Sequence, residues 1–348
     1  MKLKAGLVLI FLSFILATTH RPGQAATPAS NLTRLIEGAR QEGVVNFAGP
    51  PSLTPTGAQA LVDALNKKYA LNLKINFAPQ NSYNRLISQI IAEAQAGQTP
   101  TYDVILVVDT LIGNLYSRSL LESFDWAATF PHISPQSIML DNQALITDAI
   151  FALPAYNTNL VRPQDVPKTW EDILDPKWNG KILVPTGMQV WALLAQQWGE
   201  EKMEGFMRRL AALKPVLASY PETETRLESG EYALVANQLS PLLASSEEKK
   251  APVAYALEVK PVVVQLDVVT QVKNVRHPNA AKLFMAFSLT PEGQEVWWKY
   301  GKRTSPFLKG TPAWKFAQGK ELLIGDKDFL LKKEQELVEQ YGKIIGLR

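Results

Sequence analysis

Short apolar runs and helically spaced apolar positions follow one another along the first third of the chain. The runs at residues 44–48 and 103–108 are typical of strands, and the second, DVILVV, has the unbroken apolar character of a strand buried on both faces of a parallel sheet. Residues 56–69 and 82–96 repeat apolar side chains with the period of a helix, and residues 73–77 alternate as a strand. The order strand, helix, strand, helix, strand predicts a parallel sheet with helical crossovers.

The same alternation returns in the middle of the chain and predicts a second α/β unit. It is bracketed by apolar strands at residues 152–155 and 253–257, which we interpret as crossings between two lobes. A long strand at residues 262–272 then returns to the first unit, and the chain ends in helices. The other predicted elements are strands 181–184, 216–219 and 232–236, a helix around Trp191, and helices 201–213, 279–288, 291–300 and 331–345.

This organisation predicts an α/β protein of two lobes, each a three-layer α/β domain, joined by a hinge of two crossings. We place the first lobe at residues 26–155 and 259–348, and the second lobe at residues 156–258. Residues 1–25 are set apart as an export signal, for the reasons that follow.

The N-terminal segment has the three parts of a secretory signal. Lys2 and Lys4 give a short positive region, residues 5–17 are apolar apart from one serine, and Gly23-Gln24-Ala25 supplies the small residues of a cleavage site. The apolar part is shorter than the roughly 20 residues of a membrane-spanning helix. We expect cleavage after Ala25, and an uncleaved membrane anchor is the alternative.

Composition limits the class of protein. Of the 348 residues, 46% are hydrophobic and 20% are charged, which are ordinary globular values and exclude a disordered or multi-span membrane chain. The 36 basic residues exceed the 33 acidic ones only through Lys2, Lys4 and Arg21 of the signal, and a balanced mature chain argues against a nucleic-acid partner. Without cysteine there is no disulfide and no lipid-acceptor residue, so we expect a soluble protein of a Gram-negative periplasm and not a lipoprotein.

Residues that carry catalytic or metal chemistry are sparse. Of the three histidines, His20 lies in the signal, and His132 and His277 are interpreted as surface loop residues. With no cysteine and no histidine cluster, we predict no metal site and no cofactor. The sequence has no GxSxG, no Walker A motif and no GxGxxG after a strand, so no catalytic residue is assigned and an enzyme is the weaker hypothesis.

Four segments share the pattern of one protein family. Residues 167–182 read PKTWEDILDPKWNGKI, residues 156–158 read YNT, residues 227–233 read LESGEYA, and residues 277–294 contain HPNAAK followed by TPEGQ. Over about residues 35–310 the chain therefore resembles type II periplasmic solute-binding proteins of ABC transporters. Within that group it is most similar to the ferric-iron-binding branch of extracellular solute-binding family 1.

The resemblance implies two α/β lobes, a solute held in the cleft between them, and delivery to an ABC permease in the inner membrane. The iron-binding members carry adjacent tyrosines just after the strand that matches residues 232–236. This chain reads Ala236-Asn237-Gln238-Leu239-Ser240 there and contains no Tyr-Tyr pair. Ferric iron or an iron chelate therefore stays an alternative ligand, and only the chelate would dispense with the pair.

Candidate solute-binding residues follow the carboxyl ends of the predicted strands, where ligands of open α/β sheets bind. They share a position either in loops that lead into helices or at the hinge. They are Pro51, Ser52, Thr54, Asp109, Thr110, Tyr156, Asn157, Thr186, Gly187, Trp191, Tyr220, Thr223, Arg226, Asn237 and Gln238. For each, a structural role is the alternative: a helix cap, a turn, a hinge brace or, for Trp191, a place in the core.

Hydroxyls, amides and helix N-termini dominate this set. They favour a small polar or anionic solute such as a carboxylate, a phosphorylated compound or a sugar acid. Arg226 is expected to help bind an anion, whereas Asp109 would favour an amine. The sequence thus predicts a monomeric binding protein that works with a permease, and a ligand-sensing periplasmic protein and an exported enzyme on the same fold are the alternatives.

Overall fold

Strands in the described part of the chain form a single mixed sheet. The computed structural model describes residues 30–347, so the predicted signal at residues 1–25 lies outside the described residues. The strand order is β2-β1-β3-β10-β5-β8-β6-β7, with β11 paired to β10 and with β4 and β9 paired to β5. The strands are β1 (Val44–Gly49), β2 (Lys74–Pro79), β3 (Val104–Val108), β4 (Ile138–Met139), β5 (Ala144–Asn157), β6 (Ile182–Pro185), β7 (Val216–Ala218), β8 (Leu234–Leu239), β9 (Val253–Tyr255), β10 (Val262–Gln271) and β11 (Leu322–Ile324).

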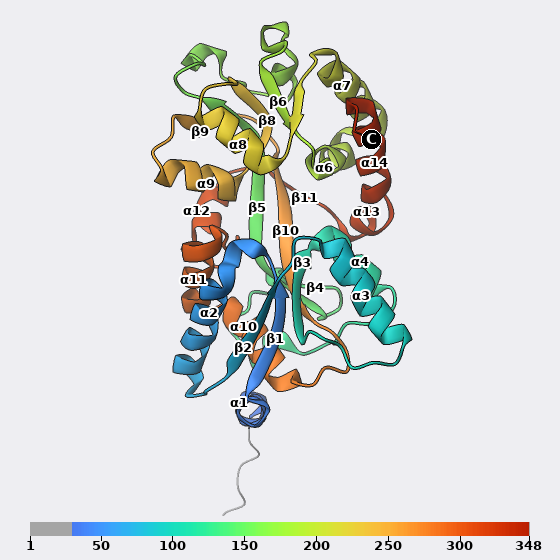
Figure 1. Ribbon diagram of the computed structural model, residues 1–348, viewed down its shortest axis with the longest axis vertical. Helices are drawn as coiled ribbons and strands as arrows, with labels where there is room; N and C mark the ends of the chain where they lie inside the picture. Colours follow the sequence, from blue (N-terminus) through green and yellow to red (C-terminus); the bar gives the residue numbers. More distant parts are fainter. Residues whose placement is uncertain (1–29, 348) are drawn as a thin grey trace, which may run out of the picture.

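Helices cover both faces of the sheet (Figure 1). The α-helices are α1 (Asn31–Glu42), α2 (Thr54–Tyr69), α3 (Tyr83–Gln95), α4 (Asp109–Tyr116), α5 (Trp126–Thr129), α6 (Gln189–Trp198), α7 (Glu200–Ala212), α8 (Tyr220–Glu228), α9 (Ser240–Glu248), α10 (Pro278–Ser288), α11 (Pro291–Gly301), α12 (Pro312–Ala317), α13 (Lys327–Lys332) and α14 (Glu334–Ile345). Short 3-10 turns are η1 (Pro51–Leu53), η2 (Pro135–Ser137), η3 (Pro163–Asp165), η4 (Glu171–Leu174) and η5 (Pro176–Trp178). Between residues 30 and 347, no helix is both long and apolar enough to cross a membrane.

Two long strands, β5 and β10, run through the middle of the molecule and connect its two ends (Figure 1). They are antiparallel, with Phe151 opposite Val264. β3 pairs with the end of β10 that begins at Asp267, whereas β8 pairs with the half of β5 that begins at Ala152. Strands β1 to β3 therefore lie at one end of the long pair, and β6 to β8 lie at the other.

The side chains of β3 show why the chain folds into layers. Val104 and Leu106 join a hydrophobic cluster with α2 and α10, whereas Ile105 and Val107 join one with α3 and α4. All four side chains are fully buried. The predicted burial of both faces is confirmed, while β3 is parallel to β1 and antiparallel to β10.

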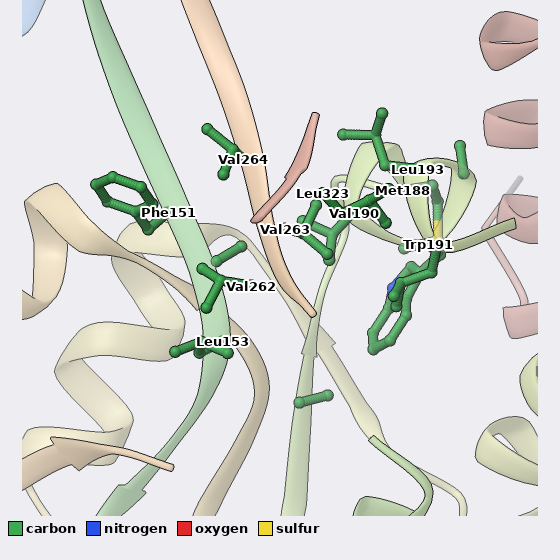
Figure 2. Packing of buried hydrophobic residues seen from close by; sticks show 14 of the residues in the cluster. Phe151, Leu153, Met188, Val190, Trp191, Leu193, Val262, Val263, Val264 and Leu323 are labelled. Atoms are coloured by element: carbon green, nitrogen blue, oxygen red, sulfur yellow. The ribbon is translucent and has the colours of Figure 1, made fainter. Parts of the chain in front are cut away.

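A continuous hydrophobic core lies where the long strands meet α6 (Figure 2). It joins β5, β10 and β11 to the inner face of that helix. The members labelled in Figure 2 are Phe151, Leu153, Met188, Val190, Trp191, Leu193, Val262, Val263, Val264 and Leu323. Val263 and Leu323 lie beside Val190 of α6 and hold that helix against the sheet, whereas Phe151 points to the other side of β5 and packs on Phe316.

Two predicted elements differ from those in the structure. The predicted strand at residues 152–155 is the end of the 14-residue β5, which continues through Asp148 because Asp267 and Arg303 lie beside that carboxyl group. The predicted helix at residues 331–345 is two helices, α13 and α14, which meet at Lys333. Asp148 within β5 and Lys333 between α13 and α14 are the polar residues at which the predicted and observed bounds differ.

The C-terminal helices contact both ends of the molecule. α13 contacts α4, where a Cβ on Gly113 would lie 1.9 Å from Cδ2 of Leu331, while α14 contacts α6 and α7. The sequence placed residues 259–348 in the first lobe, and α14 packs on α6 and α7 of the predicted second lobe. The lobe boundaries stay a prediction.

His277 lies in the loop before α10, as the sequence indicated, but it is half-buried there. Its Nδ1 lies 2.8 Å from Oδ2 of Asp103, a fully buried carboxylate that also accepts the backbone N–H of Asn46 at 2.8 Å. A buried carboxylate requires polar partners, and this loop supplies one. His132 is exposed in a turn, as predicted, and its Nε2 lies 3.1 Å from the carbonyl oxygen of Ala286.

Candidate functional site

The carboxyl ends of β6, β7 and β8 bring several predicted residues together. Pro185 pairs with Ala218, whose carbonyl also accepts the backbone N–H of Thr186 at 2.9 Å. This places the loop before α6 beside the start of α8. A Cβ on Gly187 would lie 2.9 Å from Cε2 of Tyr220, so only glycine allows the loop to approach that ring without a shift.

Asn237, near the end of β8, is the most informative of these residues. Its side chain is fully buried, and its Oδ1 accepts the hydroxyl of Tyr220 at 2.7 Å. Burial raises the pKa of Tyr220, so this phenol stays a hydrogen-bond donor. Within the described residues the Nδ2 of Asn237 has no partner, and a buried donor left without an acceptor is costly. The amide is therefore a buried donor without a partner at these strand ends, which makes it a candidate for binding a solute.

Two neighbouring predicted residues support this arrangement from behind. Thr223 donates its hydroxyl to the carbonyl of Tyr220 at 2.7 Å, and its Oγ1 accepts Nε2 of Gln238 at 3.4 Å. Gln238 also accepts the backbone N–H of Leu239 at 3.1 Å. Both side chains are buried and their described bonds are internal, so they brace the first turn of α8 against β8.

The helices that begin at these strand ends differ in their caps. α8 is capped by Ser219, whose Oγ accepts the backbone N–H of Glu222 at 3.4 Å. α6 follows Met188 and α9 follows Leu239, and neither residue can provide a side-chain cap. The first N–H groups of α6 therefore lack a side-chain acceptor, and together with the helix dipole they favour an anion beside Thr186 and Gly187.

Pro51 and Ser52 form the exposed turn η1, which follows β1 and precedes α2 near the middle of the molecule (Figure 1). Thr54 follows that turn, and its Oγ1 accepts the backbone N–H of Gly57 at 3.2 Å. These residues follow β1, as predicted, and Thr54 acts within its own helix.

Asp109 and Thr110 begin α4 and contact α14. Burial, followed by the charges of Glu334 and Asp267, raises the pKa of Asp109 well above its ordinary value. Thr110 hydrogen-bonds Glu334, whose pKa is itself raised to about 7 by burial. Because burial disfavours the charged form of Asp109, this residue is less suited to bind an amine than an exposed carboxylate would be.

A group of buried polar residues escaped the sequence reading. Asp148 of β5 lies directly opposite Asp267 of β10, beside a register shift, and both are fully buried. Arg303 donates through Nη1 to Asp267. Burial and the neighbouring Asp267 raise the pKa of Asp148 well above its ordinary value, and burial together with Asp267 also raises the pKa of Tyr83. One guanidinium thus pairs with one carboxylate, and the second carboxyl lies in surroundings that disfavour its charged form. The sequence did offer one sign of this group, namely the single acid Asp148 within the apolar strand β5.

Trp191 does not face a solute. Its side chain is 0% exposed, with ring centroids 5.8 Å from Trp170 and 5.7 Å from Phe206. The prediction of a binding role is replaced by the core role, because the aromatic neighbours enclose the indole completely.

Arg226 and the hinge residues also have partners of their own. Arg226 pairs with Glu231 at 2.7 Å and Glu222 at 3.4 Å, so its charge is matched on the outside of α8 and not directed at an anion. Asn157 donates Nδ2 to the carbonyl of Leu227 at 2.8 Å, which ties β5 to α8. Tyr156 is half-buried on β5, between β8 and β9. These residues brace the structure around the strand ends.

Metal chemistry has no built site in the part of the chain that the structure describes. No group of three or more His, Cys, Asp or Glu side chains there is arranged to hold a metal ion. The polar groups at the strand ends are amides, hydroxyls and backbone N–H groups, which suit an acceptor-rich molecule.

The chain belongs to the bacterial extracellular solute-binding protein family, whose sequence model matches residues 60–322. A curated relative, an uncharacterized protein of Haemophilus influenzae, is 27% identical over 147 residues. That match spans 40% of this chain and 42% of the relative's length.

Solved structures of periplasmic binding proteins share the fold. Iron-bound HitA from Pseudomonas aeruginosa matches with a TM-score of 0.69 at 20% identity, over 87% of this chain and 99% of that one. AfuA from Actinobacillus pleuropneumoniae, with fructose-6-phosphate bound, matches with a TM-score of 0.66 at 22% identity, over 88% and 99%. IdiA (FutA) from Trichodesmium, in complex with iron and citrate, gives 0.68 at 19% identity, over 88% and 100%. The predicted two-lobed type II periplasmic binding protein fold is confirmed.

Proposed function

We propose that this protein is the periplasmic substrate-binding component of an ABC importer, and that it captures a small polar, anionic solute between its two lobes. The observation that carries the proposal is the buried amide of Asn237, whose Nδ2 has no acceptor among residues 30–347 and which adjoins the uncapped start of α6. The solute is released unchanged to an inner-membrane permease, since the strand ends offer binding groups and no nucleophile next to a base.

Two features of the site support an anion. Backbone N–H groups at the start of α6 and the Asn237 amide are donors, while burial disfavours the charged form of Asp109 and Arg303 pairs with Asp267. Among structures of the same fold, AfuA is described with fructose-6-phosphate and IdiA with iron and citrate, and both organic ligands are anions. A phosphorylated compound or a carboxylate is the solute class that we infer.

The mechanism that we propose is closure of two lobes on the solute. The lobes of this proposal are those that the sequence predicts, residues 26–155 with 259–348 and residues 156–258. A solute that contacts both lobes stabilises the closed form, because it binds that form more tightly than the open one. A monomer suffices for this cycle.

The experiment starts with native mass spectrometry of the purified exported chain, which weighs any solute that co-purifies. A thermal-shift screen of sugar phosphates, carboxylates, amines and ferric citrate follows. A solute present at about 100 times its Kd raises the free energy of unfolding by about 2.7 kcal/mol.

Two variants assign the response to the site. Asn237→Leu keeps the size of the side chain and removes its donors, so it is expected to abolish the shift with anions. Arg226→Gln is the matched control, because Arg226 is paired on the outside of α8, and it is expected to keep the full shift. Stabilisation by amines alone, or an equal shift in Asn237→Leu and the parent protein, would overturn the proposal.

A further inference from the structure

The helices α13 and α14 form a C-terminal strap (residues 327–345) whose two contacts are unequal (Figure 1). α14 packs on α6 and α7, and its large side chains Leu337, Tyr341 and Ile345 are buried. α13 approaches α4 through Leu331, which is 37% exposed. A contact with little buried apolar surface opens before one with much. The strap is therefore anchored on α6 and α7, and its contact with α4 is the weaker one.

Polar bonds reinforce the anchored side of the strap. Lys333 pairs with Glu200 of α7 at 3.3 Å. Nε2 of Gln340 donates to Oε2 of Glu204, on the same helix, at 3.1 Å. Both bonds tie the strap to α7, so the contact with α4 depends on other groups.

The contact with α4 brings two buried carboxyl groups together. Asp109 begins α4 and Glu334 begins α14, and each residue is only 4% exposed. Thr110 hydrogen-bonds the carboxyl group of Glu334, whose Oε1 has no partner among the described residues. Beside them, a Cβ on Gly113 would lie 1.9 Å from Cδ2 of Leu331, so the absence of a side chain there admits α13. Two acids thus meet across a close contact between separate segments.

The surroundings of this pair of acids supply no compensating cation. Among the residues whose side chains are described, none of the basic ones pairs with Asp109 or Glu334. The charged side chains of the neighbouring elements are Asp148 of β5, Asp267 of β10 with its partner Arg303, Asp328 and Lys332 of α13, Lys333 and Glu336 of α14, and Glu200 of α7. α6 has no charged side chain. Burial therefore raises the pKa of Glu334 to about 7 and that of Asp109 well above its ordinary value.

We propose that the C-terminal strap is a pH-dependent switch, which holds α4 in acid and leaves it when Asp109 and Glu334 become hydrated carboxylates, while α14 stays on α6 and α7. A buried carboxylate without a cation is costly, and release of the strap returns both groups to water. The effect of the switch on solute capture rests on the proposed function, whereas the release of the strap does not.

The direction of the switch follows from linkage. A carboxyl group whose pKa is raised in a contact stabilises that contact below its ordinary pKa, and the stabilisation is lost as the pH rises through the raised value. For Glu334 this interval runs from 4.5 to about 7. The equilibrium constant for release therefore rises by up to about 300-fold across the interval from this group alone.

The test uses pairs of spin labels, because the chain contains no cysteine and two engineered ones are labelled selectively. Asn114→Cys on α4 with Lys343→Cys on α14 reports the proposed contact. Lys181→Cys, just before β6, with Lys343→Cys reports the anchored side. Double electron–electron resonance is recorded on the exported chain without solute from pH 5 to 8.5. The first pair is expected to gain a longer distance as the pH passes about 7, and the second pair to keep its distance.

Three variants assign the response to the contact. Glu334→Gln keeps the size of the side chain and removes its charge, so it is expected to retain the short distance at pH 8.5. Glu336→Gln, an exposed acid on the same helix, is the matched control and should follow the parent protein. Gly113→Leu occupies the place of Leu331 and is expected to give the longer distance even at pH 5, with circular dichroism reporting an intact fold.

Three results would overturn the proposal. They are an α4–α14 distance that is the same at pH 5 and pH 8.5 in the parent, a response of Glu334→Gln equal to that of the parent, and a lengthening of the anchored pair in step with the first. Because no solute is added, a failure of the solute-binding proposal leaves these measurements unaffected, and the two proposals fail separately.

Discussion

Glu334 at the start of α14 links the stability of the protein to pH. Its side chain is 4% exposed, and burial raises its pKa from 4.5 to about 7, against a hydrogen bond from Thr110 that lowers it. Each pKa unit corresponds to about 1.36 kcal/mol, so this proton is held by about 3 kcal/mol more in the folded protein than in the unfolded chain. The pKa of Asp109 is also raised, by burial and by the charge of Glu334.

The sign follows from linkage. A carboxyl group whose pKa is raised by folding contributes its full stability below its unfolded pKa, near pH 4.5, and loses that contribution as the pH rises through about 7. The free energy of unfolding of the parent protein is therefore expected to fall by up to about 3 kcal/mol between pH 4.5 and pH 8 from this group alone. Glu334→Gln removes this titrating group and is expected to reduce the slope of the free energy of unfolding against pH. A part of the slope remains because Asp109 still titrates.

The assay is urea unfolding followed by tryptophan fluorescence at several pH values across this window, with a check that the dependence on urea is unchanged. Glu336→Gln, an exposed acid on the same helix, is the control and should follow the parent protein. Equal slopes for the parent and Glu334→Gln, or a parent protein that grows more stable as the pH rises, would refute the reasoning.

Three further substitutions test other parts of the structure. Gly187→Ala places a methyl group against the Tyr220 ring and is expected to weaken solute binding about tenfold in calorimetry, which is about 1.4 kcal/mol. Arg303→Met leaves Asp267 without its cation and is expected to cost about 3–5 kcal/mol in urea unfolding near neutral pH, and less in acid. Trp191→Ala is expected to cost about 3–5 kcal/mol with unchanged solute affinity, since the indole lies in the core. Unaltered solute affinity in Gly187→Ala, unaltered stability in Arg303→Met or lost solute affinity in Trp191→Ala would count against the corresponding argument.

Local periodicity was sufficient to predict most strands and helices, because burial of one or two faces leaves its mark on neighbouring residues. The rule that ligands bind beyond the carboxyl ends of strands also brought Gly187, Tyr220 and Asn237 together, as the structure has them. Their placement depends only on where strands end, which the apolar runs indicate.

Features that depend on distant partners could not be predicted from the same patterns. The sequence does not show that Glu231 neutralises Arg226, or which face of α6 carries Trp191. The pairing of Asp148 with Asp267 is set by the register of two strands far apart in the chain. A single acid in an apolar strand is nevertheless a recognisable sign of a buried polar partner.

The junction at Lys333 gives the molecule a third connection between its ends, in addition to β5 and β10. α13 contacts α4 and α14 contacts α6 and α7, while Lys333 between them pairs with Glu200 at 3.3 Å. In the lobe closure that we propose, a swing of one lobe away from the other is expected to change the torsion angles at this junction or to release one of the two helices. The C-terminal segment is therefore expected to limit how wide the two lobes open in that cycle.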